Sequence, residues 1–365
     1  MLAPPYLKVP PVGYGGVELV VYERVSALIE AGARVDVVAV QGSYFPDPAR
    51  VLPVKGTPQA DFPKSRMRFV NVVRFLLHGR VVSSVVPFLA FSPEGYDCIL
   101  NDAFRPEPWI VALMLMRFGS DRLINVLHGN APYWASIAKL SNHIPISFGA
   151  LNRGMLSRLS ELGWRAFHTP NAIRFGPEAG VVSEPDRRLI FIGRVAAEKG
   201  VHHAISVSRM AGIPLDIFGK IQDPRYFLSH IKPAIDHTRV EFYERANRTF
   251  LEERLRRSAA LLHCGPMNEP FGMVVLEALR FGVPVLALKP GPLSGINDLC
   301  TSTNSFICDS TDAMAESALA LDKFSRRGIY FEARAAHSWP VVVERSLAPL
   351  INAIAEREYN RRLRS

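Results

Sequence analysis

Residues 261–288 read LLHCGPMNEPFGMVVLEALRFGVPVLAL, and this stretch predicts one strand-loop-helix-strand unit. A short apolar run, Leu261 to Cys264, ends in a Gly-Pro loop that carries Glu269. A helix pattern follows from about Phe271 to Arg280 and stops at a glycine, and Val283 to Leu288 is the next buried strand. Glu269 is therefore expected at the carboxyl end of a parallel strand, where open α/β sheets bind ligands.

A second carboxylate, Glu277, lies on the same predicted helix. It is about six residues into the helix, roughly 9 Å along the axis at ~1.5 Å per residue. The backbone N–H groups of the first turn, around Phe271 to Val274, favour an anion between the two carboxylates. A nucleotide sugar has hydroxyls at both ends and a diphosphate in the middle, as this spacing requires. The alternative for Glu277 is a solvated position of the helix.

The string NEPFGMVVLEAL at 268–279, followed by GVPV at 282–285, resembles the signature of the retaining glycosyltransferases of family 4. The resemblance implies that Glu269 contacts the donor hexose and that Glu277 contacts the ribose hydroxyls. It also implies that the donor is bound by the residues between the two glutamates, namely Phe271, Gly272 and Met273.

A second motif, GRVAAEKG at 193–200, follows a predicted buried strand. Arg194 and Lys199 stand near the two ends of this loop, where two cations can bracket a diphosphate. The alternative is a solvated charged loop. The motif is similar to the diphosphate-binding motif of the same family, and it stands in the same order upstream of the paired glutamates.

The N-terminal region carries the segment PPVGYGGVE at 10–18, in which Gly15 and Gly16 open a helix pattern over Val17 to Glu30. Such glycines let backbone approach a ligand and present N–H groups to an anion, although a plain strand-to-helix turn is the alternative. The segment resembles the family's N-terminal loop, where the glycines face the donor's phosphates. That family has a full first strand before this loop, whereas here almost none precedes it. A missing central strand would expose sheet edges; either the assigned start is internal or a shortened strand is tolerated.

His128 follows a predicted strand, Leu123 to Leu127, and precedes a glycine. A histidine at the carboxyl end of a strand is placed for a ligand, and the alternative is a hydrogen-bonded structural histidine. The position resembles the family's Leu-His-Gly motif, in which the histidine touches the donor sugar beside the reacting carbon.

The remaining pattern predicts further alternating strands and helices, among them a helix over Val201 to Ala211, a strand over Val240 to Tyr243 and a helix over Thr311 to Lys323. The glycine loop after Leu288 lacks a glutamate that is common in the family, and Asp298 could replace it.

The proline-rich segment Gln41 to Ser65 is expected to be a loop, and Trp109 to Phe118 a helix. Met67 to Phe91 is expected to be helical at first, with a strand over Val81 to Val86 as the alternative for its later part. Trp339-Pro340 is expected to break the chain before a final helix from Val342 to about Arg361.

Composition limits the function classes. The 365 residues are 48% hydrophobic and 21% charged, which is typical of a globular protein. The net charge of +9 fits a nucleic acid, an anionic membrane surface or a phosphorylated substrate, but no basic stripe interleaved with aromatic residues favours nucleic acid. The four cysteines form no C-x-x-C pair, and no apolar run reaches a membrane-spanning length, so a cytoplasmic protein without a metal site is expected.

We therefore expect an α/β protein of two Rossmann-like domains that face each other across a cleft, the GT-B arrangement that the resemblance implies. The expected domains are 1–172 on the acceptor side, 188–340 for the nucleotide sugar, and a C-terminal helix, 341–365, that packs back on the first domain. The expected function is retaining transfer of a hexose from a UDP- or GDP-sugar to an unidentified acceptor, such as a lipid carrier or a cell-surface glycan precursor.

This expectation includes no metal and no cofactor besides the nucleotide sugar, no nucleic-acid partner, and peripheral contact with the inner face of an anionic membrane. The alternatives are a catalytically impaired sugar-nucleotide-binding protein and a GT-B nucleotide-sugar epimerase.

Overall fold

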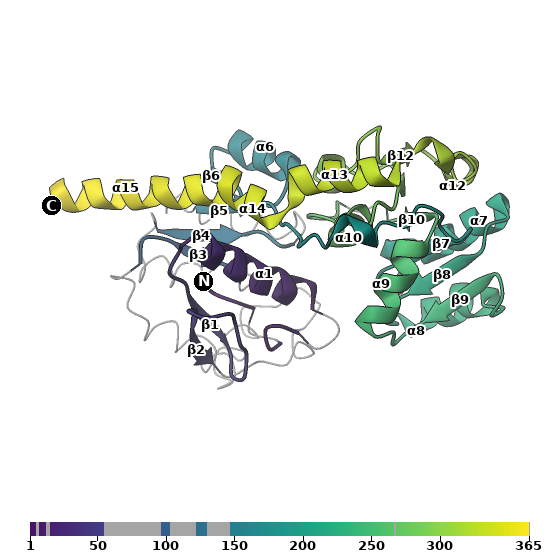
Figure 1. Cartoon of the computed structure of the whole chain (residues 1–365), viewed down its shortest axis with the longest axis horizontal. Coiled ribbons are helices and arrows are strands. Elements are labelled where there is room, and N and C mark those ends of the chain that lie inside the picture. Colours follow the sequence, from purple (N-terminus) through teal and green to yellow (C-terminus); the bar gives the residue numbers. More distant parts are fainter. Residues whose placement is uncertain are drawn as a thin grey trace, which may run out of the picture. The chain divides into compact units, whose positions relative to one another are not determined.

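The computed structural model describes residues 1–4, 7–11, 15–54, 96–102, 122–129, 147–265 and 268–364. Their contacts divide the chain into two compact units, which are described one at a time. Unit 1 contains residues 1–151, 155–170 and 342–365, and unit 2 contains residues 152–154 and 171–341 (Figure 1).

Unit 1 contains a parallel sheet whose strands come from the whole N-terminal half. The pairings join β1 to β2 and, separately, β3 to β4, β5 and β6 in that order. The bounds of the strands are β1 Asp36–Val40, β2 Arg50–Val54, β3 Ile99–Asn101, β4 Leu123–Val126, β5 Ser147–Ala150 and β6 Arg165–His168.

Leu2 joins these two sets of strands into one sheet. It forms parallel bridges with Val38 of β1 and with Asn101 of β3. The N–H of Leu2 donates to the carbonyl of Leu100 at 2.9 Å, and the N–H of Ala3 donates to the carbonyl of Val38 at 2.9 Å. The strand order is therefore β2-β1-Leu2-β3-β4-β5-β6, with the direction of winding reversed beside Leu2. The exposure of sheet edges expected from a missing central strand does not occur at this position, because residues 1–3 occupy it.

The prediction of a loop over Gln41 to Ser65 is confirmed for residues 41–49 and wrong for residues 50–54, which form the strand β2. Arg50–Val54 carries Val51 and Leu52, which suit a strand, and β2 pairs with β1 alone among the described strands. A proline such as Pro53 is accepted in an edge strand, where its missing N–H removes no ladder bond. The helices expected over Met67 to Phe91 and Trp109 to Phe118 lie outside the described residues.

The described helices of unit 1 lie at the two ends of the sequence and before β6. A break at Trp339-Pro340 was expected, but the C-terminal helical segment begins there, because proline is accepted in a first turn whose N–H groups lack helical partners. The helical segments are α1 Gly16–Glu30, α6 Arg153–Glu161, a π-helical turn Val343–Leu347 and α15 Ala348–Arg364, and the last two follow α14 Trp339–Val342, of which only Val342 belongs to unit 1.

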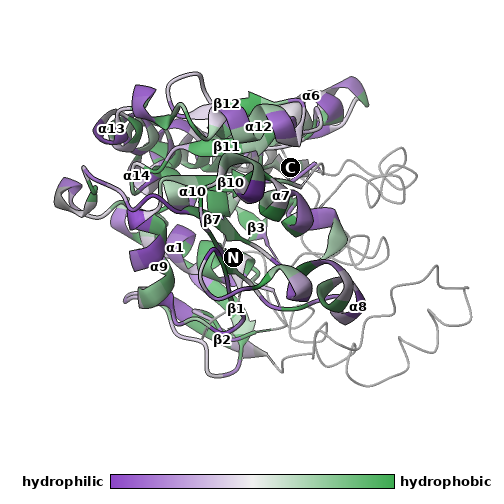
Figure 2. Ribbon diagram, turned by 90° about the vertical axis from the view of Figure 1, so that its right-hand side faces the viewer, coloured by the Kyte–Doolittle hydropathy of each residue, from purple (hydrophilic) through white to green (hydrophobic). Residues whose placement is uncertain are grey.

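Unit 2 contains a second parallel sheet, with the described strands in the order β12-β11-β10-β7-β8-β9. When the six strands are numbered 1 to 6 along the chain and read from β9 to β12, the order is 3-2-1-4-5-6. This is the order of doubly wound nucleotide-binding sheets, and the direction of winding reverses between β7 and β10. Figure 2 shows hydrophobic colour along the strands of this sheet. Their bounds are β7 Leu189–Ile192, β8 Leu215–Phe218, β9 Val240–Tyr243, β10 Ala260–His263, β11 Val285–Leu288 and β12 Ser305–Cys308.

The helices of unit 2 alternate with these strands. The sequence predicted α7 and β9 with their observed bounds, but it did not identify β12 or α13. One helix was expected over Thr311 to Lys323, whereas the structure has a helix and a separate 3-10 turn. The bounds are α7 Val201–Ala211, α8 Pro224–Tyr226, α9 Arg248–Arg257, α10 Met273–Leu279, α11 Ile296–Leu299, α12 Thr311–Ser317, the 3-10 turn Leu321–Lys323 and α13 Arg326–His337.

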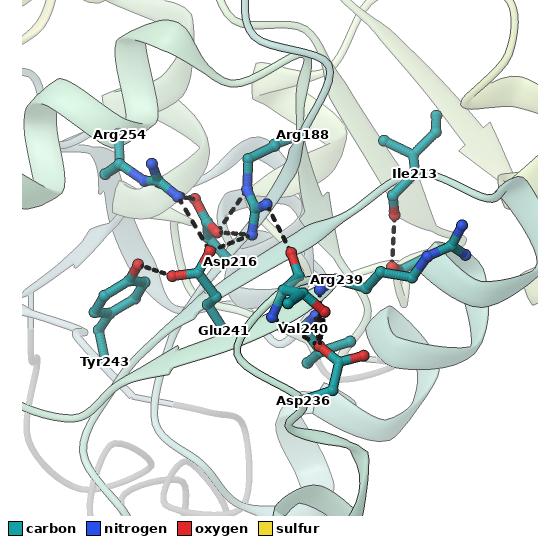
Figure 3. A network of polar contacts seen from close by, with 11 residues as sticks. Arg188, Ile213, Asp216, Asp236, Arg239, Val240, Glu241, Tyr243 and Arg254 are labelled. Atoms are coloured by element: carbon teal, nitrogen blue, oxygen red, sulfur yellow. Dashed lines mark hydrogen bonds and ion pairs between the residues drawn. The ribbon is translucent and has the colours of Figure 1, made fainter.

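A network of ion pairs joins the starts of three strands in unit 2 (Figure 3). Asp216, the second residue of β8, accepts from Nε of Arg188 at 2.9 Å and from Nε of Arg254 at 2.8 Å. Arg188 also lies 3.0 Å from the carboxylate of Glu241, the second residue of β9. The Asp216 carboxylate is 4% exposed, and two guanidinium groups compensate its charge. This network lies toward the amino ends of the strands, so it stabilises the sheet away from the carboxyl ends, where the candidate site residues stand.

Candidate active site

The sequence-predicted residues of unit 2 stand at the reversal point of its sheet. The loop of Arg194 and Lys199 follows β7, and the loop of Glu269 follows β10. The strands β7 and β10 are neighbours, with Leu189 opposite Ala260. Since parallel strands end at the same edge of a sheet, the two motifs lie together at the position where doubly wound folds bind ligands.

An ion pair joins these two motifs directly. Nζ of Lys199 donates to Oε2 of Glu269, and the two side chains are 21% and 28% exposed. Burial alone would raise the pKa of Glu269, but the charge and the hydrogen bond of Lys199 lower it below its usual range. The carboxyl group of Glu269 is therefore ionised near neutral pH, and both side chains keep contact with solvent. A ligand that carries both a negative charge and hydroxyl groups can bind Lys199 through the charge and Glu269 through the hydroxyls.

Arg194 lies at the other end of the same loop. Its guanidinium donates to Oε1 of Gln222 and lies 3.7 Å from Glu198, and its side chain is 36% exposed. The alternative of a solvated charged loop agrees with the exposure of Arg194 but not with the ion pair of Lys199.

The loop that carries Glu269 is held by close backbone packing. Gly272 has φ +96°, and a Cβ there would lie 2.4 Å from Cδ1 of Ile296. The N–H of Gly295 donates to the carbonyl of Glu269 at 2.8 Å, and a Cβ on Gly295 would lie 2.5 Å from Phe271. Both glycines are required, one for a left-handed backbone and a close contact, the other for the contact alone. The helix α10 begins directly after Gly272, at Met273.

Glu277 is not a solvated position of the helix, because the residue is 8% exposed. Its Oε1 accepts from Nη1 of Arg248 at 3.1 Å. Arg248 stands at the start of α9 and also donates to Glu252 at 2.6 Å, and Glu252 in turn pairs with Arg280 at 2.5 Å. Sequence reasoning missed Arg248, since nothing in its local pattern connects it to a residue that follows 29 positions later.

Asn152 is a second residue that the sequence did not reveal. It is fully buried, and its Nδ2 donates to the carbonyls of Pro270 at 2.7 Å and Leu293 at 3.1 Å. It thus ties the Glu269 loop to the glycine loop that follows β11. Asp298, which could have replaced a family glutamate in that region, instead accepts the backbone N–H of Arg153 at 2.7 Å.

The glycine pair of unit 1 lies at the start of α1. A Cβ on Gly15 would lie 2.6 Å from Cβ of Pro11, whereas a Cβ on Gly16 would meet nothing within 4 Å. The chain therefore requires a glycine at position 15 for close packing. The phosphate contact implied for both glycines stays a prediction.

His128 lies two residues beyond β4, and its imidazole is 3% exposed. Its Nε2 lies 2.7 Å from Oδ1 of Asp102, which also accepts from Nη1 of Arg24 at 2.5 Å. His128 is therefore hydrogen-bonded, as the structural alternative expects, and it also lies at the carboxyl edge of the sheet, as a ligand contact requires.

The cysteines are free thiols, and Cys264 and Cys308 are buried. Burial raises the pKa of Cys98 and of Cys300 to about 12. Within the described ranges, no group of three His, Cys, Asp or Glu side chains has the arrangement of a metal site. Helices in the same ranges are too short or too polar to cross a membrane.

Comparison with known proteins finds similarity to glycosyltransferases in unit 2. Residues 177–334 match the model of the family described as glycosyl transferases group 1. A stretch of 49 residues is 49% identical to the alpha-1,3/1,6-mannosyltransferase ALG2 of Kluyveromyces lactis. That stretch covers 13% of this chain and only 10% of the yeast protein.

Solved structures resemble the chain over almost its full length. AviGT4, a glycosyltransferase involved in avilamycin A biosynthesis, superposes with a TM-score of 0.65 at 16% identity, over 96% of this chain and 93% of its own. HepE of Anabaena, in complex with UDP-glucose, superposes with a TM-score of 0.64 at 16% identity, over 98% and 99% of the two chains. At these identities the likeness shows the fold alone, and it confirms the expected α/β fold of the GT-B glycosyltransferases.

Proposed function

Because residues 177–334 match the model of the glycosyl transferases group 1, we propose that this chain transfers a hexose from a nucleotide diphosphate sugar, with retention at the anomeric carbon. The observation that carries the proposal is the ion pair of Lys199 and Glu269 at the reversal point between β7 and β10. A cation suited to a diphosphate and a carboxylate suited to sugar hydroxyls meet there, although 70 residues separate them in sequence. UDP or GDP is the nucleotide that the family resemblance favours.

The leaving group of this reaction is a nucleoside diphosphate, and its developing charge has to be stabilised. Lys199 supplies a cation to it, and the exposed guanidinium of Arg194 supplies a second one. When the diphosphate takes Lys199, the carboxylate of Glu269 becomes available to the hexose hydroxyls. Glu277, held by Arg248, accepts hydrogen bonds from the ribose. The two cations fulfil the role of a metal ion, so the proposal includes no metal and no further cofactor.

The other site residues enter the proposal through the family resemblance. His128 contacts the donor sugar, Gly15 and Gly16 contact its phosphates, and Phe271, Gly272 and Met273 line the donor beside Glu269. No carboxylate of the motifs is assigned as a nucleophile, so retention is proposed to proceed by attack on the same face, guided by the leaving phosphate. The acceptor class that we propose is a lipid carrier or a cell-surface glycan precursor.

The net charge of +9 supports peripheral contact with an anionic membrane and a place at its cytoplasmic face. The alternative of a binding protein without turnover was motivated by a missing first strand. Since residues 1–3 pair with strands on both sides, the short N-terminus no longer favours a binding protein over an enzyme.

The test is thermal stabilisation by UDP, GDP, ADP and TDP and by their sugars, for the full chain and for Glu277→Ala and Arg194→Ala. A ligand that binds the folded state alone raises Tm with the logarithm of its concentration. We expect a shift with one nucleotide that both variants weaken. Arg257→Ala is the matched control, because this arginine pairs with Asp186 on the surface, outside the candidate site.

Turnover is then tested by incubating the chain with the nucleotide sugar that stabilises it and a panel of lipid-linked and oligosaccharide acceptors. Proton NMR of the product reports the anomeric configuration. The absence of any nucleotide-dependent shift in a folded sample would refute the proposed function.

A further inference from the structure

Three charged or titratable side chains from separate parts of unit 1 meet at one carboxylate oxygen. Arg24 comes from α1, Asp102 follows β3, and His128 follows β4. Oδ1 of Asp102 lies 2.5 Å from Nη1 of Arg24 and 2.7 Å from Nε2 of His128. The exposed fractions of the Arg24, Asp102 and His128 side chains are 0%, 0% and 3%. We call this group the Arg24–Asp102–His128 chain.

The group occupies the carboxyl edge of the sheet beside its reversal point. Leu2 is the central strand position, and β3 is its neighbour on the side where the winding direction changes. The backbone N–H of Asp102 donates to the carbonyl of Leu2 at 2.9 Å, so the aspartate is fixed to the central position as well. Open α/β sheets bind ligands at this edge. This location favours ligand binding over a purely structural role in the core.

The energetics also argue against a purely structural role. Burial of an ion pair removes both charges from water, and an apolar pair of similar volume is often as stable or more stable. Burial alone would raise the pKa of Asp102, but the charge of Arg24 and the hydrogen bond from His128 lower it to about 2. Asp102 is thus ionised near neutral pH, and a buried arginine holds its carboxylate in place.

The ionised carboxylate of Asp102 next to Nε2 of His128 determines which nitrogen of the imidazole carries the proton. Asp102 can only accept, so the neutral imidazole keeps its proton on Nε2 and leaves a lone pair on Nδ1. Among the described residues, no group bonds to Nδ1 of His128. That nitrogen is available to accept a hydrogen bond from a ligand hydroxyl.

We propose that Arg24 and Asp102 are positioning residues that hold His128 as the Nε2–H tautomer, so that Nδ1 accepts a hydrogen bond from a hydroxyl of the transferred sugar. The identity of the ligand rests on the proposed function, whereas the tautomer does not. The consequence is a preference of this site for the sugar nucleotide over the free nucleotide.

The first experiment needs no ligand. Long-range ¹H–¹⁵N spectra of the full chain with ¹⁵N-labelled histidine report the protonated nitrogen, and His128→Gln assigns the signal. We expect neutral His128 with its proton on Nε2, and a mixture of both tautomers in Arg24→Met/Asp102→Asn, which removes both charges together. A proton on Nδ1 in the unmodified chain, or an unchanged tautomer in the double variant, would overturn the proposal.

The second experiment separates positioning from stability. The dissociation constants for UDP and UDP-glucose, and for GDP and GDP-mannose, are measured by calorimetry. His128→Gln keeps an amide near Nε2 to bond Asp102 but removes the acceptor at Nδ1, so we expect about a tenfold loss of the preference for the sugar nucleotide, the effect of roughly one hydrogen bond. In the double variant we expect a smaller loss, set by the fraction of His128 that keeps the Nε2–H tautomer. The affinity for the free nucleotide should be unchanged in both variants.

Adding the two changes of the double variant to His128→Gln should cause no loss beyond that of His128→Gln alone, because Asp102 acts through the histidine. Additive losses, or an equal loss for the free nucleotide, would contradict the proposal. Leu123→Ala serves as the stability control, since this buried residue stands at the opposite end of β4. If no nucleotide binds, the proposed function fails, while the tautomer still decides the role of the Arg24–Asp102–His128 chain.

Discussion

The two units place charged side chains at the same point of the same kind of sheet, but with different exposure. In unit 1 the ion pair of Arg24 and Asp102 is 0% exposed on both sides. In unit 2 the ion pair of Lys199 and Glu269 keeps 21% and 28% exposure. A buried pair is costly to break and stays fixed, whereas a half-exposed pair exchanges its partners for a ligand at low cost. In our proposal, the pair in unit 1 fixes the orientation of His128, whereas the pair in unit 2 provides two charged groups that can bind a ligand in place of each other.

The largest expected effect comes from breaking the buried pair on one side. Arg24→Met leaves the carboxylate of Asp102 buried and uncompensated, and we expect a loss of about 3–5 kcal/mol in the free energy of unfolding. Arg24→Met/Asp102→Asn should lose clearly less, since no unpaired charge remains. Urea unfolding followed by circular dichroism measures both. Equal losses for the single and double variants would show that the pair is not the source of the effect.

The half-exposed pair should respond in activity and not in stability. Glu269→Gln removes the carboxylate for the hexose, so we expect kcat/KM to fall by roughly 10²–10³, as for the removal of one group that stabilises a transition state. The same change releases Lys199, so the affinity for the free nucleoside diphosphate should rise or stay equal. Calorimetry with UDP or GDP checks this. A weaker affinity would mean that Glu269 does not compete with the diphosphate for Lys199.

The acid limb of the stability curve should depend on Asp102. Its folded-state pKa of about 2 is lower than its unfolded-state value, so its contribution is complete above the unfolded-state pKa near 4 and is lost as pH falls through about 2. We expect a contribution of about 2–3 kcal/mol. Thermal unfolding between pH 5 and pH 2 measures it. In Arg24→Met/Asp102→Asn the curve should be flatter, and an identical slope would contradict the assignment.

The smallest effect is expected for Arg248, which is 47% exposed and contacts Glu277. Arg248→Ala should cost about 1 kcal/mol or less in stability, because solvent screens the pair. If this arginine orients the carboxylate for the ribose, nucleotide affinity should fall three- to tenfold, about the effect of one hydrogen bond. Arg256→Ala on the same helix is the control, since its partner is Glu253. If Arg248→Ala has the same nucleotide affinity as Arg256→Ala, Arg248 does not contribute to nucleotide binding.

Much of the fold of unit 2 follows from local patterns. Alternating apolar strands and capped helices predicted α7 and β9 with their observed bounds. By contrast, α13 went unidentified, although Ser325 caps it by accepting the N–H of Gly328 at 3.1 Å. Only Ile329, Tyr330 and Ala333 of this helix are buried, and exposed residues such as Arg327 and Arg334 flank them, so the helix depends on tertiary burial of one face.

The sequence alone determined the class of the fold and the candidate site residues of unit 2, because strand, loop and helix signals and the spacing of Glu269 and Glu277 are local. The tertiary structure decided which side chains meet. Strand order brings Asp102 next to Arg24, 78 residues away, and next to His128. Likewise, the three residues around Leu2 complete a sheet that seemed to lack its central strand. Such contacts depend on the reversal of winding and on burial, and neither leaves a periodic signal along the chain.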